Sequence, residues 1–112
     1  MCTEYQAIEI LGKVYHRANE LFGNVKDAFL YGSYARGDYG NESDVDILIV
    51  IDAPAEAIAN KRMAMARVTS DLSLEYDITV SVAVKSSEQF NRYKSVLPYY
   101  KNVIAEGIRY AG

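Results

Sequence analysis

Apolar residues recur at helical spacing in the first part of the chain. Intervals of three and four residues separate Ile8, Leu11, Tyr15, Ala18 and Phe22. Side chains at these intervals lie on one face of a helix, so the pattern predicts an amphipathic helix. Thr3 and Gln6 form a capping-box pattern at its start, and Gly23 suits the position just after its last turn.

Two short apolar runs follow this helix, and each predicts a strand. The first, VKDAFLY, spans residues 25–31 and ends at Gly32. The second, VDILIVI, spans residues 45–51 and is followed by Asp52 and Pro54. Its unbroken apolar run predicts a strand that is covered on both faces. Residues 33–43 are polar and punctuated by glycine, which indicates a helical turn followed by a loop.

The next elements are a longer helix and a third strand. Pro54 suits the first turn of a helix, and the stretch after it, rich in alanine and methionine, carries this helix to about Leu74. Residues 77–84, DITVSVAV, alternate between apolar and polar positions, which is typical of a strand.

Two shorter helices are expected at the end of the chain. Ser86 or Ser87 can cap a helix at 88–95, and Pro98 can begin a last helix that reaches Tyr110. Helices and strands thus alternate, which predicts an α/β (α+β) fold with a small mixed sheet of three or four strands. We expect the helices to lie mainly on one side of this sheet.

Composition narrows the class of protein. A length of 112 residues suits a single domain over residues 1–112. The net charge of −3 gives no basic footprint for direct binding of nucleic acid. A single cysteine, Cys2, excludes an intramolecular disulfide and a cysteine-based zinc site, and fits a cytoplasmic location. No signal peptide and no membrane-spanning run is expected, because no apolar run approaches about 20 residues.

An acidic pair stands at the mouth of the second strand. Asp44 and Asp46 are two positions apart, so both side chains point to the same side of the strand. Two neighbouring carboxylates repel each other and raise each other's proton affinity. A divalent cation bound between them removes this repulsion. Because Mg²⁺ commonly takes one or two carboxylates together with substrate phosphates, the pair predicts a metal clamp.

A third carboxylate is expected from the next strand. Asp77 begins the predicted strand at 77–84, and it can join Asp44 and Asp46 if the two strands are neighbours. Three acids hold two metal ions, or one metal ion and a base, for displacement at phosphorus. Glu75 competes for this place, because it lies two residues earlier and faces the same side if the strand begins early.

The turn after the first strand suits a phosphate. Gly32 lets the backbone approach a ligand closely. Ser33 begins a helical turn whose free N–H groups favour an anion, and Arg36, one turn further on, can contact a phosphate. We therefore predict that Gly32, Ser33 and Arg36 bind the phosphates of a nucleotide.

The spacing of these residues resembles a known signature. Gly32 and Ser33, ten residues, and Asp44-Val45-Asp46 match G-S-x(10)-D-x-D of the superfamily that includes DNA polymerase beta. The longer pattern of the minimal nucleotidyltransferases is matched at Gly32, Ser33, Ala35, Arg36, Gly37, Ser43, Asp44 and Asp46. The final stretch, LPYYKNVIAEGIRYAG, resembles the last helix of the antitoxin-type members. The resemblance implies a polymerase-beta-like fold with its catalytic core at about 23–84 and C-terminal helices at 85–112.

The resemblance also implies a mechanism. Asp44, Asp46 and Asp77 would form a Mg²⁺ site, with two metal ions expected, and Asp77 would help to deprotonate the attacking hydroxyl. Gly32 and Ser33 would hold the β- and γ-phosphates of a nucleoside triphosphate, with ATP as the expected donor. The choice among the four nucleotides depends on the shape of the pocket, which no motif specifies.

The partner implied by the resemblance is a HEPN-domain toxin. In such pairs the nucleotidyltransferase is the antitoxin and adds AMP to a tyrosine of the toxin. Residues 85–112 are too few for a separate acceptor domain, so we expect the acceptor from another protein, a second copy of the chain, or a small molecule. Two alternatives stay open: transfer to a small molecule, as in aminoglycoside-modifying relatives, and a non-catalytic antitoxin that covers its toxin.

Tyrosine is abundant in the chain, with ten residues. Tyr93, Tyr99, Tyr100 and Tyr110 gather near the C-terminus. Tyrosine is enriched at protein interfaces, so this group is a candidate interface, although any single member is more often a packing residue. His16 is the one histidine of the chain, and we assign it no role.

Overall fold

The computed structural model describes residues 3–110, so Cys2 lies outside the described part. The elements, in chain order, are α1 (Glu4–Phe22), β1 (Val25–Tyr31), α2 (Ser33–Arg36), β2 (Val45–Ile51), α3 (Ala55–Asn60), α4 (Arg62–Tyr76), β3 (Val80–Ser86), α5 (Ser87–Tyr93), α6 (Pro98–Glu106) and β4 (Ile108–Arg109). The strands form one sheet in the order β3-β2-β1-β4. β1 runs antiparallel to β2 and β4, whereas β3 runs parallel to β2. The predicted mixed sheet is confirmed.

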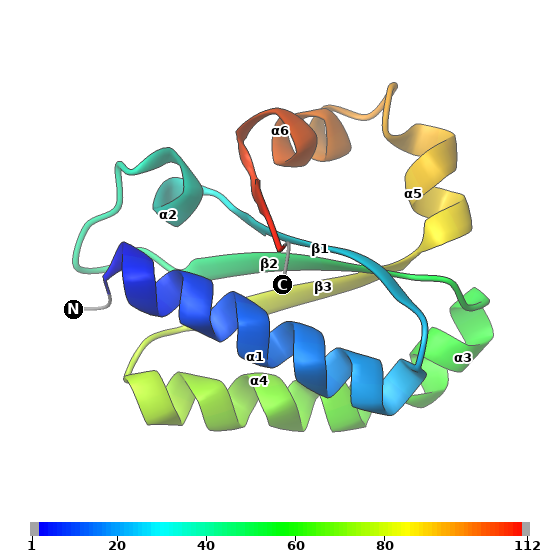
Figure 1. Ribbon diagram of the computed structural model, residues 1–112, viewed down its shortest axis with the longest axis horizontal. Helices are drawn as coiled ribbons and strands as arrows, with labels where there is room; N and C mark the ends of the chain where they lie inside the picture. The colour runs from blue at the N-terminus through cyan, green and yellow to red at the C-terminus, as the bar shows by residue number, and fades with distance from the viewer. Residues whose placement is uncertain (1–2, 111–112) are drawn as a thin grey trace.

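Helices cover both faces of the sheet unequally. The two long helices, α1 and α4, lie side by side against one face, and the shorter α5 and α6 lie over the other (Figure 1). The larger core lies under the long helices, where Ile10, Leu11 and Val14 of α1 are fully buried. The smaller core joins Phe29 and Leu48 of the sheet to residues of α5 and α6.

The unbroken apolar run of β2 follows from this two-sided cover. Ile47 and Ile49 belong to the core under α1 and α4, whereas Leu48 and Val50 belong to the core under α5 and α6. Each of these four side chains is at most 1% exposed. The prediction that both faces of this strand are covered is therefore confirmed.

The start and end of α1 follow the predicted signals. The side chain of Thr3 accepts a hydrogen bond from the Gln6 backbone, and the Gln6 side chain accepts one from the Thr3 backbone, which completes the capping box. Gly23 takes the left-handed conformation, with φ at 85°. The predicted buried face is partly wrong, because Ile8 is 40% exposed while Ala7 and Ile10 are buried. The buried face of α1 therefore includes Ala7 and Ile10 and leaves Ile8 outside it.

Three predicted boundaries in the second half are wrong. The single helix expected from Pro54 to Leu74 is broken into α3 and α4 at Lys61, whose φ of −110° and ψ of 12° are not helical. The third strand begins at Val80 instead of at residue 77, because α4 continues to Tyr76. The last helix ends at Glu106, and the following residues form β4, which pairs with β1. Among residues 3–110, no helix has the length and apolar character needed to cross a membrane.

Candidate active site

The acidic pair of the motif lies at the start of β2. Asp44 directly precedes the strand and is exposed, whereas Asp46 is its second residue and is half-buried. Alternate side chains of a strand share a face, so Asp46 lies on the same face as Leu48, which packs under α5 and α6. The pair therefore lies on the α5–α6 side of the sheet, at the edge where β1 ends and β2 begins.

Gly32 brings the turn after β1 against the second carboxylate. Its φ of 76° and ψ of −154° lie in a region that is open essentially to glycine alone. A Cβ built on Gly32 would lie 2.5 Å from Oδ2 of Asp46. The absence of a side chain thus allows the backbone of the turn to approach the carboxylate. The predicted phosphate turn and the predicted metal ligand are brought together.

Ser33 and Arg36 belong to the short helix that follows. Ser33 is the first residue of α2, and no side chain caps this helix end. The Arg36 guanidinium forms ion pairs with Asp38 at 3.1 Å and with Glu106 of α6 at 3.5 Å. The hydrogen bond with Asp38 is the main reason that the pKa of Arg36 is raised. A phosphate would have to compete with these two carboxylates for the guanidinium.

The surroundings of Asp46 favour its neutral form. Burial raises the pKa of Asp46 above its usual value, the nearby Asp44 carboxylate raises it further, and the Arg36 charge opposes both. The protein's own charges therefore do not fully stabilise the ionised form of Asp46. A cation bound between the two carboxylates would stabilise it.

The predicted third carboxylate is not in place. Asp77 lies outside β3 and caps the C-terminus of α4 in the left-handed conformation, with φ at 52° and ψ at 50°. Glu75 lies on α4 and pairs with Lys13 of α1 at 2.7 Å, under the opposite face of the sheet. Within residues 3–110, no group of three or more His, Cys, Asp or Glu side chains is arranged to hold a metal ion. The expected three-carboxylate cluster is not found among these residues, because β3 begins too late to include Asp77.

The residues beside Asp46 were not expected from the sequence. In the two ladders, Asp46 is paired with Tyr31 of β1 and with Ser81 of β3. The Tyr99 hydroxyl of α6 donates a hydrogen bond to the Tyr31 hydroxyl at 2.9 Å. Burial raises the pKa of both phenols, which stay neutral and able to hydrogen bond. The sequence did hold one signal for Tyr31. Tyr31 directly precedes Gly32, and a residue at the end of β1 lies opposite the first residues of β2.

A comparison with known protein families decides the assignment. Residues 11–111 match the family model described as the nucleotidyltransferase domain. The chain belongs to the nucleotidyltransferase domain family. This confirms the predicted family and the predicted class of enzyme.

Curated relatives of this nucleotidyltransferase come from Methanocaldococcus jannaschii. The candidate protein adenylyltransferase MJ0604 is 39% identical over 85 residues, which cover 76% of this chain and 77% of the relative. The candidate protein adenylyltransferase MJ0141 is 45% identical over 53 residues, which cover 46% of this chain and 50% of the relative.

Solved structures share the fold of this nucleotidyltransferase. A candidate nucleotidyltransferase from Sulfolobus solfataricus aligns with a TM-score of 0.63 at 21% identity, covering 95% of this chain and 80% of the other. A chain of a toxin–antitoxin structure with AMP-PNP aligns with a TM-score of 0.59 at 17% identity, covering 90% and 72%. A chain of the toxin–antitoxin pair MntA–HpeT aligns with a TM-score of 0.57 at 19% identity, covering 90% and 71%. These likenesses concern the fold.

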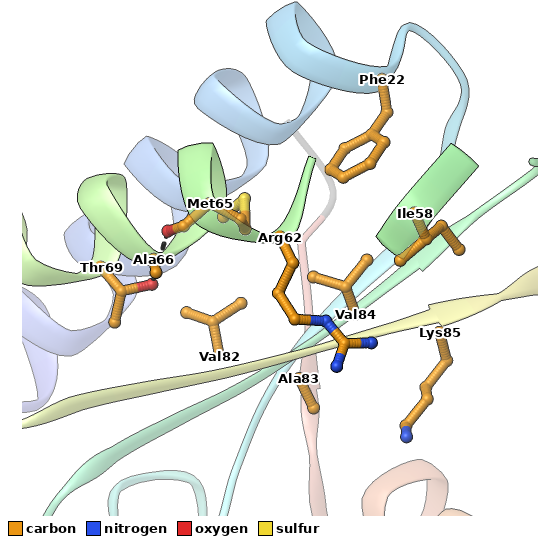
Figure 2. A pocket seen from close by; sticks show the side chains of 10 residues that line it. All are labelled: Phe22, Ile58, Arg62, Met65, Ala66, Thr69, Val82, Ala83, Val84 and Lys85. Carbon is orange, nitrogen blue, oxygen red and sulfur yellow. Dashed lines mark hydrogen bonds between the residues drawn. The ribbon is translucent and has the colours of Figure 1, made fainter. Parts of the chain in front are cut away.

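A separate cavity of about 330 Å³ lies between β3 and the helices α3 and α4. Its lining is mainly apolar and includes Phe22, Ile58 and Met65, with Arg62 extending across the edge of β3 (Figure 2). Neither residue of the acidic pair lines it. The candidate site at the Gly32 turn is therefore separate from this cavity.

Proposed function

We propose that this nucleotidyltransferase transfers AMP from ATP to a tyrosine of a HEPN-domain toxin and thereby acts as its antitoxin. The close approach of the Gly32 turn to Asp46 carries the proposal, because it joins the turn predicted to bind phosphate to a carboxylate pair. The names of the curated relatives favour a protein as the acceptor. The fold neighbours from toxin–antitoxin structures favour a toxin as that protein.

In this proposal Asp44 and Asp46 hold Mg²⁺. Two carboxylates beside a phosphate site are the ligands that Mg²⁺ commonly takes in proteins, so the residues present fit one such ion. In the transfer the tyrosine oxygen bonds to the α-phosphorus of ATP, and pyrophosphate leaves. The bound ion would supply positive charge that stabilises the negative charge of the reacting phosphates. Gly32 lets the phosphates approach the backbone, and Ser33 and Arg36 bind their oxygens from the α2 side.

The acceptor in this proposal is a phenol. No carboxylate from β3 is available in the described residues to take a proton from the attacking hydroxyl. A tyrosine hydroxyl ionises with a pKa of about 10 and loses its proton more readily than an aliphatic hydroxyl. This difference favours a tyrosine over a sugar hydroxyl.

The reducing cytoplasm, which supplies ATP and suits a single cysteine, is the proposed location.

An exposed apolar surface adjoins the site and suits a protein partner. Its large hydrophobic residues are between 37% and 65% exposed, and they are Tyr93, Val96, Leu97, Tyr99 and Ile104. The Tyr99 hydroxyl links this surface to Tyr31, the neighbour of Asp46. Exposed apolar residues gathered on neighbouring segments, here α5, α6 and the turn between them, commonly mark protein interfaces. A toxin bound here would have its acceptor residue near the acidic pair.

Radiolabel transfer tests the proposal. The protein is incubated with ATP labelled at the α-phosphate, Mg²⁺ and a HEPN toxin encoded beside its gene. We expect label on a toxin tyrosine with the wild type and with Asp71→Asn, a matched change on the exposed side of α4. We expect about a hundredfold less label with Asp46→Asn, because a ligand of the proposed metal ion is lost.

The competing function is a non-catalytic antitoxin, which the missing third carboxylate favours. It predicts a tight complex and relief of toxicity without label, in the wild type and in Asp46→Asn alike. Label that appears on an added aminoglycoside but never on the toxin would contradict both functions.

A further inference from the structure

Ser81 is the β3 residue that lies beside Asp46. The parallel ladder pairs Asp46 with Ser81 and Leu48 with Ala83. Leu48 and Ala83 both belong to the core under α5 and α6, whereas Val80 and Val82 pack on the opposite side. Ser81 therefore shares the face of Asp46, and it is exposed.

This position is close enough to share a cation with Asp46. Neighbouring strands lie about 4.8 Å apart, and paired side chains on one face stand side by side. A carboxylate at position 81 would therefore reach a cation bound by Asp46. Asp77 has no such paired position, because it caps α4 and precedes Val80, the first residue of β3 that is paired with β2.

The other neighbour of Asp46 is also a neutral hydroxyl. Tyr31 is paired with Asp46 on the β1 side, and its hydroxyl accepts a hydrogen bond from Tyr99. Asp46 thus lies between two hydroxyl side chains in the sheet. The negative charge at this end of the sheet comes from Asp44 and Asp46 together.

We infer that Ser81 occupies the third ligand position of the site, and that the site holds a single divalent cation with two carboxylates. The inference rests on the proposed function and specifies its metal requirement. Cation affinity follows the number of charged ligands. Binding of the cation without nucleotide is therefore weak, and the phosphates of the nucleotide complete its coordination.

Binding of Mn²⁺ tests the inference without measuring transfer. Free Mn²⁺ is followed by electron paramagnetic resonance in titrations of the full chain, with and without AMP-PNP. We expect one Mn²⁺ per wild-type chain with AMP-PNP, and binding at least about tenfold weaker without it. Ser81→Asp should tighten binding without nucleotide about tenfold or more, as expected for an added charged ligand. Asp77→Asn should bind as the wild type does.

Controls separate charge from packing. Ser81→Asn adds a side chain of similar size without charge, and Ser70→Asp adds the same charge on the exposed side of α4. Neither should tighten Mn²⁺ binding, and all variants should show the cooperative thermal unfolding of the wild type. The Ser81→Asp gain should vanish in the double variant that also carries Asp46→Asn.

Two results would overturn the inference. One is Ser81→Asp binding Mn²⁺ no more tightly than Ser81→Asn, and the other is loss of Mn²⁺ binding in Asp77→Asn. If the wild type still binds one Mn²⁺ with AMP-PNP and Asp46→Asn does not, the proposed function survives either result. If the wild type binds neither AMP-PNP nor Mn²⁺, the proposed function fails together with the inference.

Discussion

Replacing Gly32 with alanine perturbs the contact that defines the site. The new Cβ would lie 2.5 Å from Oδ2 of Asp46, a separation that real Cβ atoms do not adopt. The backbone at φ 76° and ψ −154° also disfavours any side chain, at a cost of about 1–3 kcal/mol. The clash is relieved at low cost by rotation of the Asp46 side chain, because the contacting atom is at its end. We therefore expect moderate destabilisation and displacement of the carboxylate.

Urea unfolding and Mn²⁺ binding measure the two effects of Gly32→Ala separately. A loss of about 1–3 kcal/mol should lower the urea midpoint by roughly 1 M. Mn²⁺ binding with AMP-PNP should weaken at least about tenfold, because a ligand is displaced. Gly23→Ala is the matched control, since Gly23 has φ at 85° but nothing lies within 4 Å of the place that a Cβ would take. Equal Mn²⁺ affinity in the two variants would refute the reasoning, since both carry backbone strain and one alone meets Asp46.

Three further predictions concern charge, core and helix end. The folded-state pKa of Asp46 is raised, so its contribution to stability is present below its ordinary pKa of 3.8 and is lost as pH rises through the folded pKa. Asp46→Asn should therefore stabilise the cation-free protein at pH 7 but not at acidic pH. Urea midpoints of the two proteins at each pH measure this difference. Leu48→Ala removes a fully buried side chain of β2 and should lower the free energy of unfolding by about 2–5 kcal/mol in urea titrations. Thr3→Ala breaks the capping box of α1 and should cost about 1 kcal/mol, with the thermal midpoint lowered by a few degrees.

Local signals in the sequence were sufficient for the first half of the fold. The capping box at Thr3 and the glycine at position 23 define both ends of α1 through contacts within a few residues. The apolar run of β2 indicates burial on both faces without any knowledge of its neighbours. The motif at Gly32 and Asp46 is visible in the sequence because a single strand–turn–strand unit fixes the spacing of its residues.

The end of α4 could not be predicted because contacts distant in sequence hold it. Lys13 of α1 pairs with Glu75, and the Tyr76 hydroxyl donates a hydrogen bond to Glu9 of α1. These contacts hold α4 to Tyr76, beyond its predicted end at about Leu74. Asp77 then takes the left-handed conformation, which is uncommon outside glycine. An acid that looked like a strand residue is consequently a helix cap.

The C-terminal tyrosines show why composition alone could not assign roles. Tyr100 is buried in the smaller core, Tyr110 packs against Tyr15, and Tyr99 contacts Tyr31 beside the site. Their environments depend on how α6 and β4 return to the sheet, and a strand as short as β4 has no detectable periodicity. The interface expected of this group stays a prediction.

In the proposed site, the surroundings of Asp46 would link metal binding to nucleotide binding. Two carboxylates can neutralise one divalent cation, and burial and the neighbouring Asp44 raise the pKa of Asp46 while the cation is absent. Its strand neighbours, Tyr31 and Ser81, contribute hydroxyls and no further charge. A cation therefore binds most tightly when phosphate oxygens of the nucleotide supply its remaining ligands. On this reasoning the protein binds the cation–nucleotide complex as a unit, and the affinity measured for either component alone should be lower than for both together.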